Sequence, residues 1–322
     1  MTKSTLLIAF VCVFHFVNAQ QLPLFTQYRD NLGIINPASP SVDFLINNLT
    51  TSLGASYRKQ WTGLENSPET QVIRYEHIGA YTGNAFSPMF GAYALRDITG
   101  PLGMTGLYGK FGAAMTDDAE EGGFSAALSA GLVAYHLDTD KIRVRDADDI
   151  VTAGRRTQLF PDLGLGVFAW KRLTGSGFFD DDMLSGGLSV PQLMGLNLRF
   201  KNDKQSFSTR RLQHFYGQFS WLHSIEDREK LVQASVWLKY AKNAPFNVDF
   251  NFRYQLIPAM WIGLGGSSGG NFHAETGFNI GENAGLDGLL RLGYGFDYSF
   301  SQIGPFAGST HELNLTYSFG GR

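Results

Sequence analysis

Strict alternation of apolar and polar residues is the main pattern of this chain. The stretch FNVDFNFRYQL at 246–256 has Phe, Val, Tyr or Leu at every second position and Asn, Asp, Arg or Gln between them. A second stretch, THELNLTYSF at 310–319, has the same pattern close to the C-terminus. Its apolar positions are Leu313, Leu315, Tyr317 and Phe319. Because successive side chains of a strand point to opposite faces, each stretch predicts a strand with one apolar, aromatic face and one polar face.

Comparable stretches recur along the chain and are separated by turn signals. The pattern predicts fourteen strands, at 50–61, 69–80, 88–97, 104–115, 123–137, 161–172, 184–191, 211–223, 229–241, 246–256, 259–267, 270–280, 287–300 and 310–319. The second to fourth and the seventh of these are weakly patterned, so twelve or sixteen strands remain alternatives. Beyond the N-terminal 20 residues no run of eighteen apolar residues occurs, and no transmembrane helix is expected.

Two architectures use strands with one apolar and one polar face. In a soluble or periplasmic sandwich the apolar faces fill a core, whereas in a membrane barrel they face lipid. The apolar faces here are rich in Phe and Tyr, often at strand ends, and the polar faces carry Arg, Asp, Asn, Gln and many Gly. This combination favours a lipid-facing exterior with aromatic belts and a wet or plugged interior. We therefore predict an all-β, transmembrane, antiparallel β-barrel over residues 50–322, in which the last strand closes against the first.

The N-terminus has the features of a secretory signal peptide. Lys3 precedes an apolar run from Leu6 to Val17, and the small residue Ala19 follows shortly after. The run is too short for a membrane span, so residues 1–19 are expected to be cleaved during export to the bacterial outer membrane. Cys12 is the only cysteine and is lost with this peptide, which leaves the mature chain without a disulfide or a cysteine metal site.

Residues 20–49 form a segment that precedes the barrel. The stretch NPASPS at 36–41 contains two prolines, so it lies neither in a strand nor in the interior of a helix. A segment of this length either plugs the lumen or lies in the periplasm. If both termini are periplasmic, the two longest connections, 138–160 and 192–210, face outside, as expected for barrels with long outer loops.

The sequence offers little that resembles catalytic chemistry. The net charge of −3 gives no basic surface for a nucleic-acid partner. Aspartates cluster at 146–149 and 180–182, but they lack the ligand spacing of a calcium loop. The histidines lack metalloprotease spacing. We expect no catalytic, metal-binding or cofactor-binding residues and no enzymatic activity.

Three stretches together resemble a known family. QQLPLFTQYRDNLGIINPA opens the mature chain, SYRKQWTGLENSPETQ covers the first strand, and GSTHELNLTYSF covers the last. They are similar to the PorP/SprF family of outer-membrane proteins, which belong to the type IX secretion system of Bacteroidetes. GLSVPQL at 187–193 adds a weaker similarity. The positions that match the motifs of the family are Asn36, Pro37, Ala38, Arg58, Gln60 and Trp61. The family often has Tyr-Ala-Gly after its Asn-Pro-Ala, whereas Ser39, Pro40 and Ser41 follow here.

The resemblance implies a non-enzymatic barrel that exports or anchors a secreted surface protein. Such partners carry a C-terminal type IX sorting domain, and many are adhesins or gliding-motility proteins. Further partners would be other type IX secretion components and outer-membrane lipid, and the connections 138–160 and 192–210 are candidates for the contact with cargo. Independently of the family, Trp61 is expected to be an interfacial anchor, and Arg58 to line a channel or hold a plug. A passive pore or transporter for small solutes remains the alternative function.

Overall fold

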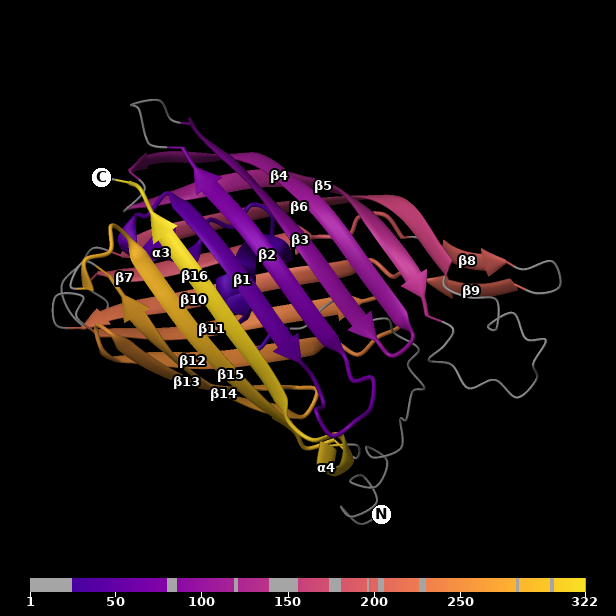
Figure 1. Ribbon diagram of the computed structural model, residues 1–322. Coiled ribbons are helices and arrows are strands. Elements are labelled where there is room, and N and C mark those ends of the chain that lie inside the picture. Colours follow the sequence, from indigo (N-terminus) through magenta and orange to yellow (C-terminus); the bar gives the residue numbers. More distant parts are fainter. Residues whose placement is uncertain are drawn as a thin grey trace, which may run out of the picture.

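The barrel is antiparallel and closed. The computed structural model describes residues 25–79, 86–118, 121–138, 156–173, 181–195, 197–201, 206–225, 230–281, 284–301 and 304–321. Within them, fourteen strands form one continuous ring in which neighbours in the chain are neighbours in the sheet (Figure 1). The ring closes where β1 pairs with β16, from Thr51 opposite Phe319 to Lys59 opposite His311. This closure satisfies the backbone groups that a sheet edge would expose to lipid.

The observed strands confirm the predicted fold class and strand number. The barrel strands are β1 (Thr51–Lys59), β2 (Glu69–Ile78), β3 (Phe86–Thr99), β4 (Leu102–Asp118), β5 (Gly122–Leu137), β6 (Arg156–Leu173), β7 (Asp182–Val190), β10 (His214–Ile225), β11 (Lys230–Ala241), β12 (Asn247–Ile257), β13 (Met260–Ser267), β14 (Asn271–Ile280), β15 (Leu289–Ser299) and β16 (Thr310–Phe319). Within the described residues, no helix is long and apolar enough to span a membrane.

The alternating pattern sorts side chains between outside and inside as predicted. On β16, Leu313 is 56% exposed on the outer face, whereas the neighbouring Glu312 is completely buried in the lumen. On β12, Phe250 is 50% exposed and Asn251 is completely buried. An apolar exterior around a polar interior is the arrangement of an outer-membrane barrel and the reverse of a soluble one.

Two connections differ from the prediction. The connection at 192–210 contains a two-stranded sheet of its own, β8 (Asn197–Lys201) with β9 (Ser206–Arg210), which projects away from the ring (Figure 1). The connection predicted at 138–160 is shorter, because β6 already begins at Arg156. Its central part, like the predicted signal peptide 1–19, lies outside the described residues.

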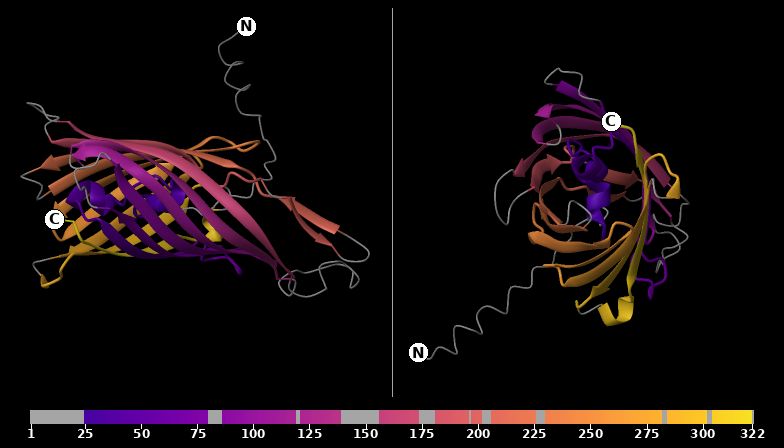
Figure 2. Two further views of the ribbon diagram at one scale, coloured as in Figure 1. Left: turned by 90° about the horizontal axis from the view of Figure 1, so that it is seen from above. Right: turned by 90° about the vertical axis from the view of Figure 1, so that its left-hand side faces the viewer.

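The segment before the barrel lies inside the ring of strands (Figure 2). It contains a short 3-10 helix, η1 (Tyr28–Asn31), followed by α2 (Leu32–Ile35) and α3 (Val42–Asn47). The side chain of Ser41 caps α3 by accepting a hydrogen bond from the Phe44 N–H at 3.2 Å, and Asn48 ends it in the left-handed conformation, with φ of 57°. Residues 36–41 form neither helix nor strand. We call residues 25–48 the lumen segment.

The lumen segment runs from one mouth of the barrel to the other. We call the end where β1 stops and β2 starts the loop mouth, because it carries the connection with β8 and β9. The opposite end, where β1 starts and β16 stops, is the turn mouth. Thr26 contacts Asp297 and Glu312 near the loop mouth, whereas Asp43 contacts Ser318 near the turn mouth. The described chain therefore ends at the turn mouth and begins towards the loop mouth.

Candidate functional site: the filled lumen

The start of the lumen segment is bonded to the first and last strands of the barrel. The backbone N–H groups of Thr26 and Gln27 donate to the two carboxylate oxygens of Glu312, at 2.7 and 3.1 Å. Arg58 on β1 forms ion pairs with Asp297 at 2.7 Å and with Glu312 at 3.4 Å, and it also donates to the Thr26 hydroxyl. The carboxylate of Glu312 is thus satisfied by groups from two directions, as a buried charge requires.

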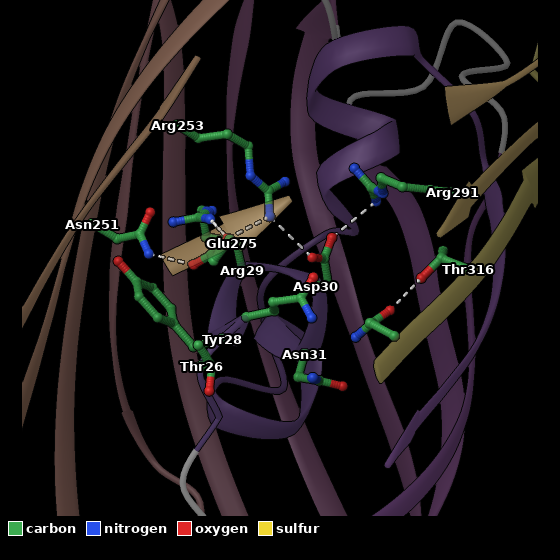
Figure 3. A network of polar contacts seen from close by, with 12 residues as sticks. Thr26, Tyr28, Arg29, Asp30, Asn31, Asn251, Arg253, Glu275, Arg291 and Thr316 are labelled. Carbon is green, nitrogen blue, oxygen red and sulfur yellow. Dashed lines mark hydrogen bonds and ion pairs between the residues drawn. The ribbon is translucent and has the colours of Figure 1, made fainter. Parts of the chain in front are cut away.

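A network of buried charges surrounds the middle of the segment (Figure 3). Asp30 lies between Arg253 and Arg291, whose Nη2 atoms are 3.3 and 3.2 Å from its carboxylate oxygens. Arg29 and Arg253 share the carboxylate of Glu275, at 2.5 and 3.1 Å. Asp30 is buried, and the guanidinium groups of Arg291 and Arg253 compensate the charge of its carboxylate. The segment is therefore attached to β12, β14 and β15 by charge pairs.

Asn36 fits into a notch between β6 and β7. Its Nδ2 atom donates to the Val167 carbonyl at 3.0 Å, and its Oδ1 atom accepts from the Ala38 N–H at 3.0 Å. Gly166 and Gly187 form the sides of the notch. A Cβ atom at Gly166 would lie 2.0 Å from Oδ1 of Asn36, and one at Gly187 would lie 2.7 Å from its Nδ2. The two glycines are therefore required for the close approach of the carboxamide to the wall.

Further polar contacts fix the segment towards the turn mouth. Ser189 on β7 donates to the carbonyl of Ile35 at 2.8 Å, and Ser125 on β5 donates to that of Ala38 at 2.7 Å. Asp43 on α3 accepts from Arg291 at 2.9 Å and from the Ser318 hydroxyl at 2.6 Å.

Apolar side chains fill much of the remaining lumen. Near the loop mouth, the ring of Tyr28 packs against Trp237, with centroids 5.3 Å apart. Near the turn mouth, Phe44 meets the edge of Trp170 at 6.0 Å. Each pair belongs to a larger cluster of buried hydrophobic residues. The inside of this barrel therefore resembles the core of a soluble domain, although the strands present mostly polar residues to it.

Three cavities border the lumen segment, two of them small and one larger. One lies beside Tyr28 and one beside Phe25, each of about 30 Å³. The third, of about 250 Å³, lies between α3 and the wall near the turn mouth. A volume of about 30 Å³ corresponds to roughly one water molecule, so only the third has room for a ligand.

The structure brings some of the family-motif residues together and separates others. Asn36, Pro37 and Ala38 lie in the lumen segment beside the notch, and Arg58 binds the start of the same segment. Gln60 follows the end of β1, and its N–H donates to the Pro68 carbonyl at 2.8 Å.

Trp61 lies in the connection between β1 and β2, because β1 ends at Lys59 and not at residue 61 as predicted. Its φ is 57°, and its N–H donates to the Thr310 hydroxyl at 3.2 Å. The apolar residues of the last strand point outward on β16. These are Leu313, Leu315, Tyr317 and Phe319.

Sequence reasoning did not find the partners in the charge network. They are Arg29, Asp30, Arg74, Arg253, Glu275 and Arg291. Two features of the sequence could have indicated this network. Charged residues recur on the polar faces of the strands, and an Arg-Asp pair lies in the segment before the barrel. Pairing between them depends on barrel register, which one sequence does not give.

The described residues contain no group of three or more His, Cys, Asp or Glu side chains that could hold a metal ion. Of the two aspartate clusters, only Asp181 and Asp182 lie in the described part. Asp181 forms an ion pair with Arg172 at 2.6 Å, and Asp182 contacts His223 at 2.5 Å and accepts from the Trp221 ring N–H at 2.6 Å.

A comparison with protein families shows what this barrel is related to. The sequence model of the type IX secretion system membrane protein PorP/SprF matches residues 17–317. The chain belongs to the PorP/SprF family. The match covers the lumen segment and nearly all of the barrel, and it makes the chain a membrane protein of a secretion system rather than a member of an enzyme family. No curated protein matches the chain.

Solved structures resemble this PorP/SprF member in fold. A mutant of the monoaromatic hydrocarbon channel TodX superposes with a TM-score of 0.51 at 9% identity, over 91% of this chain and 94% of that one. The translocator domain of the autotransporter NalP from Neisseria meningitidis has a TM-score of 0.46 at 12% identity, over 86% and 91% of the two chains. Omp33 from Acinetobacter baumannii has 0.45 at 8% identity, over 84% and 98%. At 9% identity, the similarity to TodX supports the barrel fold and nothing about function.

Proposed function

We propose that this barrel is a non-enzymatic outer-membrane partner of a secreted type IX cargo protein, which it exports, anchors at the cell surface, or both. The cargo would be adhesin-like and carry a C-terminal sorting domain. Family membership supports this proposal. The observation that carries it is the filled lumen, because a barrel bonded to its own N-terminal segment from Thr26 to Asp43 is better suited to a scaffold than to a conduit.

We place the cargo contact at the loop mouth, around β8 and β9. Long connections face outside in barrels of this type, and binding residues concentrate on loops held by a rigid scaffold. The base of the hairpin is held in this way. Arg211, which directly follows β9, forms a buried ion pair with Asp162 of β6 at 2.5 Å. It also donates to Gln192 at 2.8 Å, and Tyr108 donates to Asp162 at 2.9 Å.

Removal of the hairpin tests this placement. We would replace 197–210 with a short Gly-Ser linker, which keeps Arg211 and all the pairs of the barrel. The matched control replaces α4 (Gly304–Ala307), which lies in another connection at the loop mouth. Both variants would be purified from the native membrane in mild detergent, and the proteins that accompany them identified. We expect a large secreted protein to accompany the wild type and the α4 variant but not the hairpin variant. Equal recovery with all three would exclude the hairpin as the contact.

The alternative function is a passive pore or transporter for small solutes. It predicts that the purified barrel conducts in a planar bilayer, whereas the scaffold proposal predicts no conductance while the lumen segment is in place. Other type IX secretion components and outer-membrane lipid are further proposed partners.

We also propose that export uses a cleaved signal peptide, residues 1–19. Mass spectrometry of the purified protein would then find Gln20 as the first residue. A chain that retains Met1 in the outer membrane would contradict this.

A further inference from the structure

We propose that the cavity near the turn mouth is a binding site for a small carboxylate that carries an aliphatic group. The cavity has a volume of about 250 Å³ and lies between α3 and the inner wall of the barrel. It is distinct from the loop mouth, where we place the cargo contact, and the inference does not depend on cargo export.

The cavity is rich in positive charge. Three arginines from three strands line it, Arg172 of β6, Arg253 of β12 and Arg291 of β15. Asp43 is the only acidic side chain among the described residues that line it, and its carboxylate already binds Arg291 and Ser318. The remaining acidic partners of these arginines lie outside the lining. An anion in the cavity would therefore face three guanidinium groups, and opposite charges attract each other more strongly at the border of a protein interior than in bulk water.

Arg253 and Arg291 keep donors for a ligand. The ion pairs of Arg253 and Arg291 run through the Nη2 atom in each case. Among the described residues, no hydrogen bond uses the Nη1 atom of Arg253 or of Arg291. Both Nη1 atoms are accessible rather than buried. The side chains of Arg253 and Arg291 stay 9% accessible, and that of Arg172 8%. Guanidinium groups with accessible N–H atoms are suited to the two oxygens of a carboxylate.

The other walls of the cavity select the rest of the ligand. Leu45 and Ile46 of α3 face Leu222, Leu231 and Leu289 across it. Gln233, Gln255 and Asn279 add amide groups. Their NH2 groups already donate to Ser220 or to the Pro258 carbonyl, and the amide oxygens of Gln233 and Asn279 are left to accept an N–H of the ligand. Pockets for drug-sized ligands have roughly 300–1,000 Å³, so this one suits a smaller molecule, about the size of one acylated amino acid.

Two sources would supply this chemistry. One is a free small carboxylate, and the other is the C-terminal residue of a polypeptide, which presents an aliphatic side chain, an amide and a carboxylate together. N-acetyl-L-leucine has all three groups and is a probe for both. N-acetyl-L-leucinamide is the matched control, because it differs only in the missing negative charge. A longer peptide that ends in the same residue separates the sources, because it binds only if the cavity admits a chain end.

Calorimetry of the full-length protein in detergent tests the proposal. We expect saturable binding of N-acetyl-L-leucine, and binding of the amide weaker by roughly tenfold or more, since a hydrogen bond to a charged group contributes about 1.5–3 kcal/mol. Equal binding of the two compounds, or no saturable binding of the carboxylate, would overturn the proposal. Equally tight binding of inorganic phosphate would overturn the aliphatic part, because phosphate makes no use of the leucine wall.

Variants locate the site without disturbing the central charge network. Arg172→Gln removes one guanidinium whose partner Asp181 lies near the surface, and it should weaken binding by about tenfold. Ser224→Trp fills the cavity and should abolish binding. Lys239→Gln removes another lumen cation, which pairs with Asp249 outside the cavity, and should leave binding unchanged. Heat-modifiable migration in gels confirms that each barrel is folded. Unchanged binding by the folded Ser224→Trp variant would place the ligand elsewhere.

Discussion

The notch that holds Asn36 allows a quantitative test of how the lumen segment is attached. In Gly166→Ala the new methyl group would lie 2.0 Å from Oδ1 and 2.9 Å from Cγ of Asn36, so the carboxamide must leave. Its two hydrogen bonds, to the Val167 carbonyl and from the Ala38 N–H, are then lost. At about 1 kcal/mol each, their loss destabilises the docked segment by about 2 kcal/mol, which raises the population of the opened segment roughly 30-fold.

A single thiol reports this opening. Cys12, the only native cysteine, precedes the predicted cleavage site, so Ser39→Cys gives one thiol in the mature chain. Ser39 is completely buried, and cysteine is close to it in size. The rate of labelling by a maleimide should rise roughly 30-fold in Gly166→Ala, while the heat-modifiable migration of the barrel stays normal. Lys59→Cys, on the outer face, gives the rate of an accessible thiol.

The decisive variant combines Gly166→Ala with Asn36→Ala. Asn36→Ala alone should also raise the labelling rate, because the same two hydrogen bonds disappear. In the double variant the methyl group occupies the space that the carboxamide has left, so the rate should equal that of Asn36→Ala and not the product of the two single effects. Independent, multiplicative effects would refute the view that Asn36 fills this notch.

Three further predictions concern the barrel and its contents. Phe319→Ala or deletion of 310–322 should lower the amount of assembled barrel, because β16 closes the ring, and normal levels of heat-modifiable barrel would contradict this. Asp30→Asn leaves Arg253 and Arg291 with fewer partners and should cost about 3–5 kcal/mol, seen as a lower unfolding temperature than in Glu65→Gln at the surface. Deletion of 25–47 should produce conductance in planar bilayers, and a silent deletion variant would show that the segment does not close the lumen.

The sequence was sufficient for the barrel because lipid imposes a period-2 pattern on each strand. Residues 246–256 and 310–319 show that pattern without interruption, and their faces point as predicted. The ends of strands were less predictable. β6 begins at Arg156 rather than at 161, because its first residues pair with β5 beyond the last pair with β7, where the apolar alternation is weaker.

The lumen was predictable only in part. Two prolines showed that 36–41 is irregular, but they left open whether the segment lies in the barrel or in the periplasm. Its place depends on partners such as Glu312, which is separated from Thr26 by 286 positions in the chain. The glycines of the notch were equally hidden, because Gly166 and Gly187 lie among many glycines and gain their meaning only from the register of β6 with β7.

The double attachment of the lumen segment has a consequence for the order of assembly. Arg58 on β1 and Glu312 on β16 both form hydrogen bonds with Thr26. Ser56 on β1 also donates to Asn31 at 3.1 Å. Joining the first and last strands of a long chain costs closure entropy, and the segment offsets part of this cost by offering both strands a common template. We expect β1 and β16 to pair around the lumen segment, which belongs to the same chain. We therefore expect barrel closure and lumen filling to be coupled during folding, so that removal of the segment slows the pairing of β1 with β16.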